Sequence, residues 1–104
     1  MAEAESLTTA SDERLLAMES DLHRDFLKSK DRLASLSAQR ALQQEQVQQA
    51  AALAELVFKA YRIGGTSYLE VQSASLRTLE AGTALAGTET QMLIELAALD
   101  ALSR

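Results

Sequence analysis

The stretch AYRIGGTSYLEV, residues 60–71, decides the fold, because it ends one helix and starts another within a few residues. Gly64 can adopt the left-handed conformation that closes a helix C-terminus. Ser67 can cap the next helix, and Glu70, three residues later, completes a capping box. A connection this short sends the second helix back along the first. The stretch therefore predicts the tip of an antiparallel α-hairpin.

The remainder of the chain has the composition of long helices. Its 104 residues contain no proline and four glycines. Alanine, leucine, glutamine and glutamate dominate, and all four are strong helix formers. We therefore expect one all-α domain, a long coiled-coil-like hairpin. Its expected parts are a flexible N-terminus at residues 1–9, a helix over 10–63, a tip at 64–66 and a helix over 67–103.

The first predicted helix carries two apolar stripes. The main one advances by alternating steps of four and three, as a coiled-coil seam does. Its members are Leu22, Phe26, Ser29, Leu33, Leu36, Arg40, Gln43, Val47, Ala50, Ala54, Val57 and Tyr61. A smaller stripe runs beside it through Ala34, Ala38, Ala41, Ala52, Leu56 and Ala60. Two neighbouring stripes predict a helix that touches more than one partner.

The second predicted helix has an apolar face at helical spacing. It consists of Leu69, Leu76, Leu79, Leu85, Ala86, Leu93, Leu96, Leu99 and Leu102. Gly82 and Gly87 interrupt this helix, and each costs about 1 kcal/mol relative to alanine in a helix interior. Two interpretations stay open. The glycines are either tolerated weak points or places where another helix comes very close.

The unequal helix lengths predict self-association. The first helix would be about 80 Å long and the second about 55 Å. Residues 11–26 would then lack a partner within the chain, although they include Leu15, Leu16, Met18 and Leu22. Two helices alone also bury too little surface for stability. We expect a homo-oligomer, most simply a dimer, with the projecting residues packed on a neighbouring copy. Alternatively, the first helix breaks near Ser29–Asp31 and folds back as a third helix.

Several functions find no support in the sequence. The net charge of −5 argues against nucleic acid, and no apolar run is long enough to insert in a membrane. His23 lies one turn from Glu19 but has no second histidine, so no metal site and no cofactor are expected. No catalytic group lies near a serine of the tip, so an enzyme is not expected. The N-terminal residues lack the features of a signal peptide, so the chain as written is expected in the cytoplasm.

The residues around the tip carry a family resemblance. The segment AYRIGGTSYLEVQSASLRTLEAGTALAGTETQMLIELAALDAL, residues 60–102, resembles the closing hairpin of TolC-like outer-membrane efflux proteins. The matching positions are Tyr61, Gly64, Ser67, Leu69, Glu70, Val71, Ala74, Leu79, Leu85 and the terminal LDAL. Upstream, DFLKSKDRLASLSAQRALQQEQVQQAAALAELVFKAY, residues 25–61, looks like the long helix before that tip. The resemblance is closest to the heavy-metal resistance branch and covers about residues 15–104.

The resemblance implies a location and a partner. In that family, trimers form an outer-membrane β-barrel and a helical tunnel in the periplasm, and the hairpin tip meets a periplasmic adaptor protein. The implied contact residues are Tyr61, Arg62, Gly64, Gly65, Thr66 and Ser67. The arginine that some members carry after the tip glycine is absent here, because Thr66 stands in that place. The chain corresponds to at most about a quarter of such a protein, and the first repeat and the strands of the family are not in it.

Less specific interpretations of the same residues stay open. Tyr61 and Tyr68 can shield the turn rather than gate a pore. Lys59 and Arg62 complement the dipole at the C-terminus of the first helix, which is reason enough for their presence. As an alternative function, the chain is a stand-alone coiled-coil interaction module that is unrelated to transport.

Overall fold

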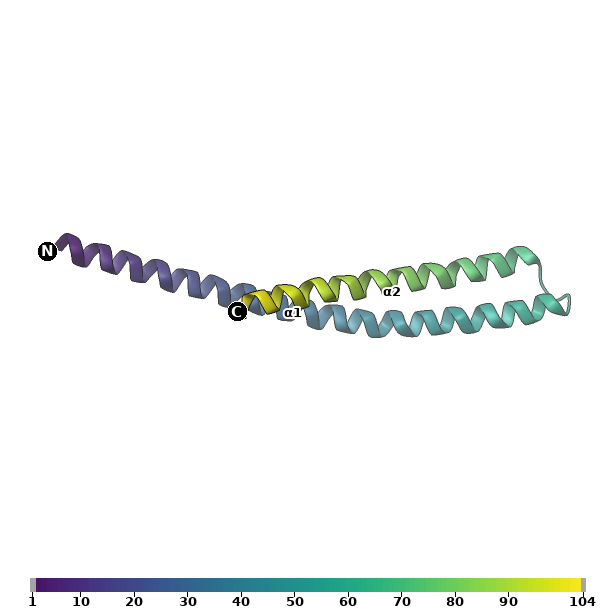
Figure 1. Ribbon diagram of the computed structural model, residues 1–104. Helices are drawn as coiled ribbons and strands as arrows, with labels where there is room; N and C mark the ends of the chain where they lie inside the picture. Colours follow the sequence, from purple (N-terminus) through teal and green to yellow (C-terminus); the bar gives the residue numbers. More distant parts are fainter. Residues whose placement is uncertain (1, 104) are drawn as a thin grey trace.

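The computed structural model describes the backbone of residues 2–103 and the side chains of residues 9–103. This part of the chain forms two helices, α1 (Ala2–Arg62) and α2 (Tyr68–Leu102). Helix α2 returns along α1, and the N-terminal part of α1 projects beyond it (Figure 1). The molecule measures 93 × 17 × 16 Å along its principal axes. The expected all-α antiparallel hairpin is thereby confirmed.

The helix boundaries differ from the expected ones mainly at the N-terminus. Helix α1 begins at Ala2 instead of residue 10, because residues 2–9 contain neither proline nor glycine to interrupt it. It is continuous through Ser29–Asp31, so the alternative with a third helix is wrong. At the tip, α1 ends at Arg62 and α2 begins at Tyr68, each within one residue of the expected position.

The C-terminus of α1 is closed by hydrogen bonds that depend on Gly64. This residue has a φ of +81°, in the left-handed region that disfavours side chains. Its amide donates to the carbonyl of Tyr61 over 3.0 Å, and the Gly65 amide donates to the carbonyl of Ala60 over 2.7 Å. These two bonds form a Schellman motif. They satisfy two carbonyls that a helix end otherwise leaves without a partner.

The N-terminus of α2 is capped by Ser67. Its hydroxyl accepts a hydrogen bond from the Glu70 amide over 3.4 Å, and its backbone is extended. The Glu70 carboxylate does not complete the expected box with Ser67, because it accepts a hydrogen bond from the Thr66 hydroxyl instead. Tyr61 and Tyr68 pack across the turn, with ring centroids 5.7 Å apart. The tip is therefore held by backbone bonds, a cap and a ring pair.

The seam of α1 follows the predicted spacing over its paired length. The side chains that α2 covers at least partly include Phe26, Ser29, Leu33, Leu36, Gln43, Val47, Ala50, Ala54 and Val57. The two exceptions among the paired positions are Arg40 and Tyr61, which are exposed. Leu22 is also exposed, because it lies beyond the end of α2. The regular four-and-three spacing thus identifies the face of α1 that meets α2.

The seam of α2 differs from the predicted leucine face. The positions that face α1 are mostly small or polar, namely Val71, Ala74, Thr78, Ala81, Leu85, Thr88, Met92, Glu95, Leu99 and Leu102. Of the predicted face, Leu69, Leu76, Leu79, Leu93 and Leu96 are instead exposed. Leu85, Leu99 and Leu102 of the predicted face do lie on the seam. The leucine pattern therefore combines part of the seam with a second, exposed face of α2.

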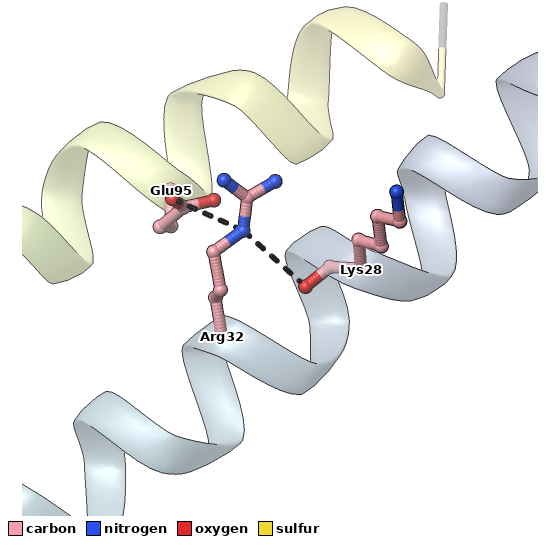
Figure 2. Close-up of polar contacts among 3 residues, drawn as sticks. All are labelled: Lys28, Arg32 and Glu95. Atoms are coloured by element: carbon pink, nitrogen blue, oxygen red, sulfur yellow. Dashed lines mark hydrogen bonds and ion pairs between the residues drawn. The ribbon is translucent and has the colours of Figure 1, made fainter.

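Two ion pairs between the helices fix their alignment. Arg40 Nε lies 3.4 Å from Glu89 Oε1, and Arg32 Nε lies 3.7 Å from Glu95 Oε1. Figure 2 shows that Arg32 Nε also points at the carbonyl of Lys28, to which it donates over 3.5 Å. The Arg40–Glu89 pair is exposed, and such a pair contributes about 0–1 kcal/mol, whereas the Glu95 side chain is only 14% exposed. The two pairs set the register of α2 along α1, because a shift of α2 along α1 would separate both pairs at once.

Gly64→Ala is expected to destabilise the hairpin by about 1–2 kcal/mol, because alanine is strained at a left-handed position. Gly65→Ala is the matched control: its φ is not positive, although its Cβ would lie 3.3 Å from the Ala60 carbonyl oxygen. Urea unfolding followed by circular dichroism gives both free energies. Equal losses in the two variants would show that the left-handed turn does not depend on Gly64.

Gly87→Ala tests the two interpretations of the interrupting glycines. A Cβ at Gly82 or Gly87 would meet nothing within 4 Å in the single chain, so the hairpin itself does not require glycine there. The substitution is expected to raise the free energy of unfolding by about 1 kcal/mol. Urea unfolding at low protein concentration measures it. A loss of stability that grows with protein concentration would instead reveal a helix from another copy packed against Gly87.

Candidate functional site

The tip forms one open hollow. It has a volume of about 460 Å³ and is lined by Leu56, Val57, Ala60, Gly65, Thr66, Ser67 and Glu70. Three of the six predicted contact residues, Gly65, Thr66 and Ser67, thus share a surface with the end of α1. The hollow is apolar on its α1 side, and hydroxyls and a carboxylate line the turn side.

The other predicted contact residues have partners within the tip. Tyr61 is 40% exposed and packs against Tyr68. The Arg62 guanidinium lies 6.0 Å from the centre of the Phe58 ring, a distance at which a cation–π attraction is still felt. Gly64 holds the left-handed turn. Tyr61 and Tyr68 therefore contact each other across the turn, as a shielding role would require.

Ile63 is a surface residue of the tip that the sequence interpretation did not single out. It is 86% exposed, more than any other large apolar residue among the described side chains. Its position directly before Gly64 takes it off the end of α1 and away from the seam. The sequence signal that could have identified Ile63 is its place directly before the helix-closing Gly64. Its exposure makes it the strongest candidate for an apolar contact at the tip.

A second exposed surface lies on the side of α2 that faces away from α1. It consists of Leu69, Leu76, Leu79, Leu93 and Ile94, which are between 55% and 70% exposed. We call this set the outer face of α2. On α1, Leu42, Leu53 and Leu56 form a smaller exposed flank. A helix that is apolar on two faces is typical of the interior of a larger helical assembly.

Metal and membrane sites find no support in the described residues. Residues 9–103 contain no group of three or more His, Cys, Asp or Glu side chains that could hold a metal ion. His23 lies on the projecting part of α1, far along the helix from the tip. Neither α1 nor α2, as described, is both long enough and apolar enough to cross a membrane.

Comparison with known proteins gives no match: no protein-family model, no curated protein and no solved structure is similar to the chain. The function must therefore be argued from the residues and from their geometry.

Proposed function

We propose that the chain is a non-catalytic hairpin of the kind that builds the periplasmic tunnel of an outer-membrane efflux channel. In this proposal its tip docks onto a periplasmic adaptor protein of a tripartite pump. The single observation that carries the proposal is the tip itself. A glycine-closed helix end and a Ser67 cap present Ile63, Gly65 and Thr66 at the extreme end of a long hairpin. The family resemblance of residues 60–102 points to the same place.

The apolar faces support a role as one wall element among several. A compact monomer of 11.3 kDa would expose about 5,700 Å² of surface. This chain exposes 8078 Å², and the difference is larger than the surface that each partner buries in a standard interface, about 800 Å². Part of this excess belongs to the projecting end of α1, but the outer face of α2 belongs to the paired region. Packing against neighbouring hairpins would cover that face.

For the chain on its own, we propose a homodimer in which the outer faces of α2 meet. A two-fold axis places the same residues on both sides of such an interface. The result would be a four-helix bundle, with α2 from both copies at its centre.

Ile63→Asp is expected to weaken docking to an adaptor hairpin while leaving the fold unchanged. The side chain is 86% exposed, so its replacement costs the hairpin little. A charge placed in an apolar contact would weaken binding by about tenfold or more. Biolayer interferometry with purified adaptor hairpins from efflux systems measures the affinity, and circular dichroism checks the fold. Leu27→Asp, at an exposed leucine far from the tip, is the control.

Gly65→Trp adds bulk at the same surface. The Cβ of a side chain at position 65 would lie 3.3 Å from the Ala60 carbonyl oxygen, which is a tight contact. This variant is therefore interpretable only when circular dichroism shows an intact hairpin. Unchanged docking by both folded variants would remove the tip from the interface. It would then favour the second candidate function, a coiled-coil interaction module unrelated to transport, for which the two apolar faces of α2 are sufficient.

A further inference from the structure

The projecting end of α1 continues the seam past the end of α2. Leu15, Met18 and Leu22 precede Phe26 by eleven, eight and four residues, so all four share one face of the helix. Phe26 is half-buried at the last turn of the pair, whereas Leu15, Met18 and Leu22 are 56%, 61% and 51% exposed. We call residues 9–25 the projecting segment and these three side chains its stripe. The stripe is an apolar seam without a second helix in this structure.

The projecting segment differs from the rest of the molecule in charge. Residues 1–25 contain seven acidic and two basic side chains, whereas residues 26–104 contain eight of each. The net charge of −5 is therefore concentrated before the paired region, which is neutral. This separation is not needed to form the hairpin, since the ion pairs that join α1 and α2 lie at Arg32 and Arg40.

The acidic groups lie beside the stripe. Side chains three or four residues apart are neighbours on a helix surface. Glu19 is therefore a neighbour of both Leu15 and Leu22. In the same way, Asp21 lies one turn from Met18, and Asp25 lies one turn from Leu22. Carboxylates at the edges of an apolar seam select the charge of a partner helix.

We infer that the projecting segment is a docking site for a basic amphipathic helix of another protein. The partner's apolar side chains would pack on Leu15, Met18 and Leu22, and its lysines or arginines would face Glu19, Asp21 and Asp25. This site lies at the end of the molecule opposite to the tip (Figure 1). The inference goes beyond the proposed function and does not depend on it.

The charge separation disfavours other occupants. Residues 9–25 contain five acidic and two basic side chains, so pairing of two projecting segments from two copies would bring two net charges of −3 together. Like charges at the edges of a seam are destabilising. Residues 26–104 of a second copy carry no net charge, so they do not attract the acidic projecting segment electrostatically. An anionic lipid surface attracts basic rather than acidic helices. Packing of the projecting segment on a neighbouring copy, expected from the leucines alone, is therefore less favoured than a basic partner.

The test uses the full chain and two synthetic helical peptides, each about three heptads long. Both carry leucines along one seam, one with lysines at the flanking positions and the other with glutamates. Fluorescence anisotropy is measured at low and at high salt. The lysine peptide is expected to bind, to weaken as salt rises, and to bind at least about tenfold more tightly than the glutamate peptide.

Two double variants locate the binding. The double variant Leu15→Ser, Leu22→Ser is expected to lower the affinity for the lysine peptide by at least about tenfold. The double variant Glu19→Lys, Asp25→Lys is expected to lower the same affinity by about tenfold. Leu69→Ser with Leu76→Ser, on the outer face of α2, is the matched control and should leave this binding unchanged. All substituted side chains are exposed, so the hairpin stays folded, which circular dichroism checks.

Three results would overturn the inference. Equal binding of the two peptides would show that charge does not select the partner. Unchanged binding of the lysine peptide by the Leu15→Ser, Leu22→Ser variant would place its site elsewhere. Absent peptide binding, together with dissociation of a wild-type dimer by that same variant, would show that a second copy occupies the stripe.

Discussion

Leu76→Ser combined with Leu93→Ser is expected to convert the proposed dimer into a folded monomer. Both side chains lie on the outer face of α2, at 55% and 68% exposed, and neither contributes to the seam with α1. Full burial of a leucine contributes about 1.5–3 kcal/mol. A two-fold interface loses four leucines at once, so the dissociation constant should rise by about 10⁴-fold or more.

Light scattering over a concentration series measures this change, and circular dichroism shows whether the helices persist. Leu27→Ser is the control, because Leu27 is a leucine of α1 with a similar exposure of 47% and lies outside the outer face of α2. A double variant that stays dimeric would exclude this face as the interface. A double variant that unfolds would show that the monomeric hairpin needs its partner to be stable.

Ala74→Asp is expected to destabilise the hairpin by about 3 kcal/mol or more, the usual cost of an uncompensated buried charge. Ala74 is the most buried apolar residue among the described side chains, at 5% exposed. An aspartate side chain is too short to carry its charge out to solvent along an apolar stem. Because two helices have little stability to lose, this single change should abolish the cooperative pairing of α1 and α2.

Ala84→Asp, on an exposed position of the same helix, is the matched control. It loses only helix propensity, which is about 0.5–0.7 kcal/mol. Thermal unfolding followed by circular dichroism separates the two variants. Equal melting temperatures would mean that the seam through Ala74 does not hold the helices together.

The tip and the seam of α1 could be predicted because their chemistry is local. A glycine that closes a helix and a serine that caps the next one act within a few residues. The four-and-three spacing of α1 is a property of one helix, and it identified the paired face from Phe26 to Val57. The break considered near Ser29–Asp31 does not occur, since no residue there prevents helical backbone.

The seam of α2 could be predicted only in part: Leu85, Leu99 and Leu102 lie on it, but most of its other positions are small or polar. Ala74, Thr78 and Thr88 face α1, whereas Leu76 and Leu93 face away. A pattern search that follows leucine finds the larger apolar stripe and assigns it to the intrachain partner. Which of the two stripes meets α1 depends on how closely the helices approach each other. That approach is set by the side chains of both helices together, so it cannot be read from α2 alone. Ile63 was missed for a related reason, since its exposure follows from the path of the turn.

Sedimentation equilibrium of the unmodified chain tests most directly the claim that this hairpin is completed by a second copy. The single chain has a mass of 11.3 kDa. We expect twice that mass at about 10 μM, a concentration above the micromolar dissociation constants of weak complexes. We also expect a helical circular dichroism spectrum under the same conditions. A folded protein that keeps the mass of one chain at that concentration would contradict the claim.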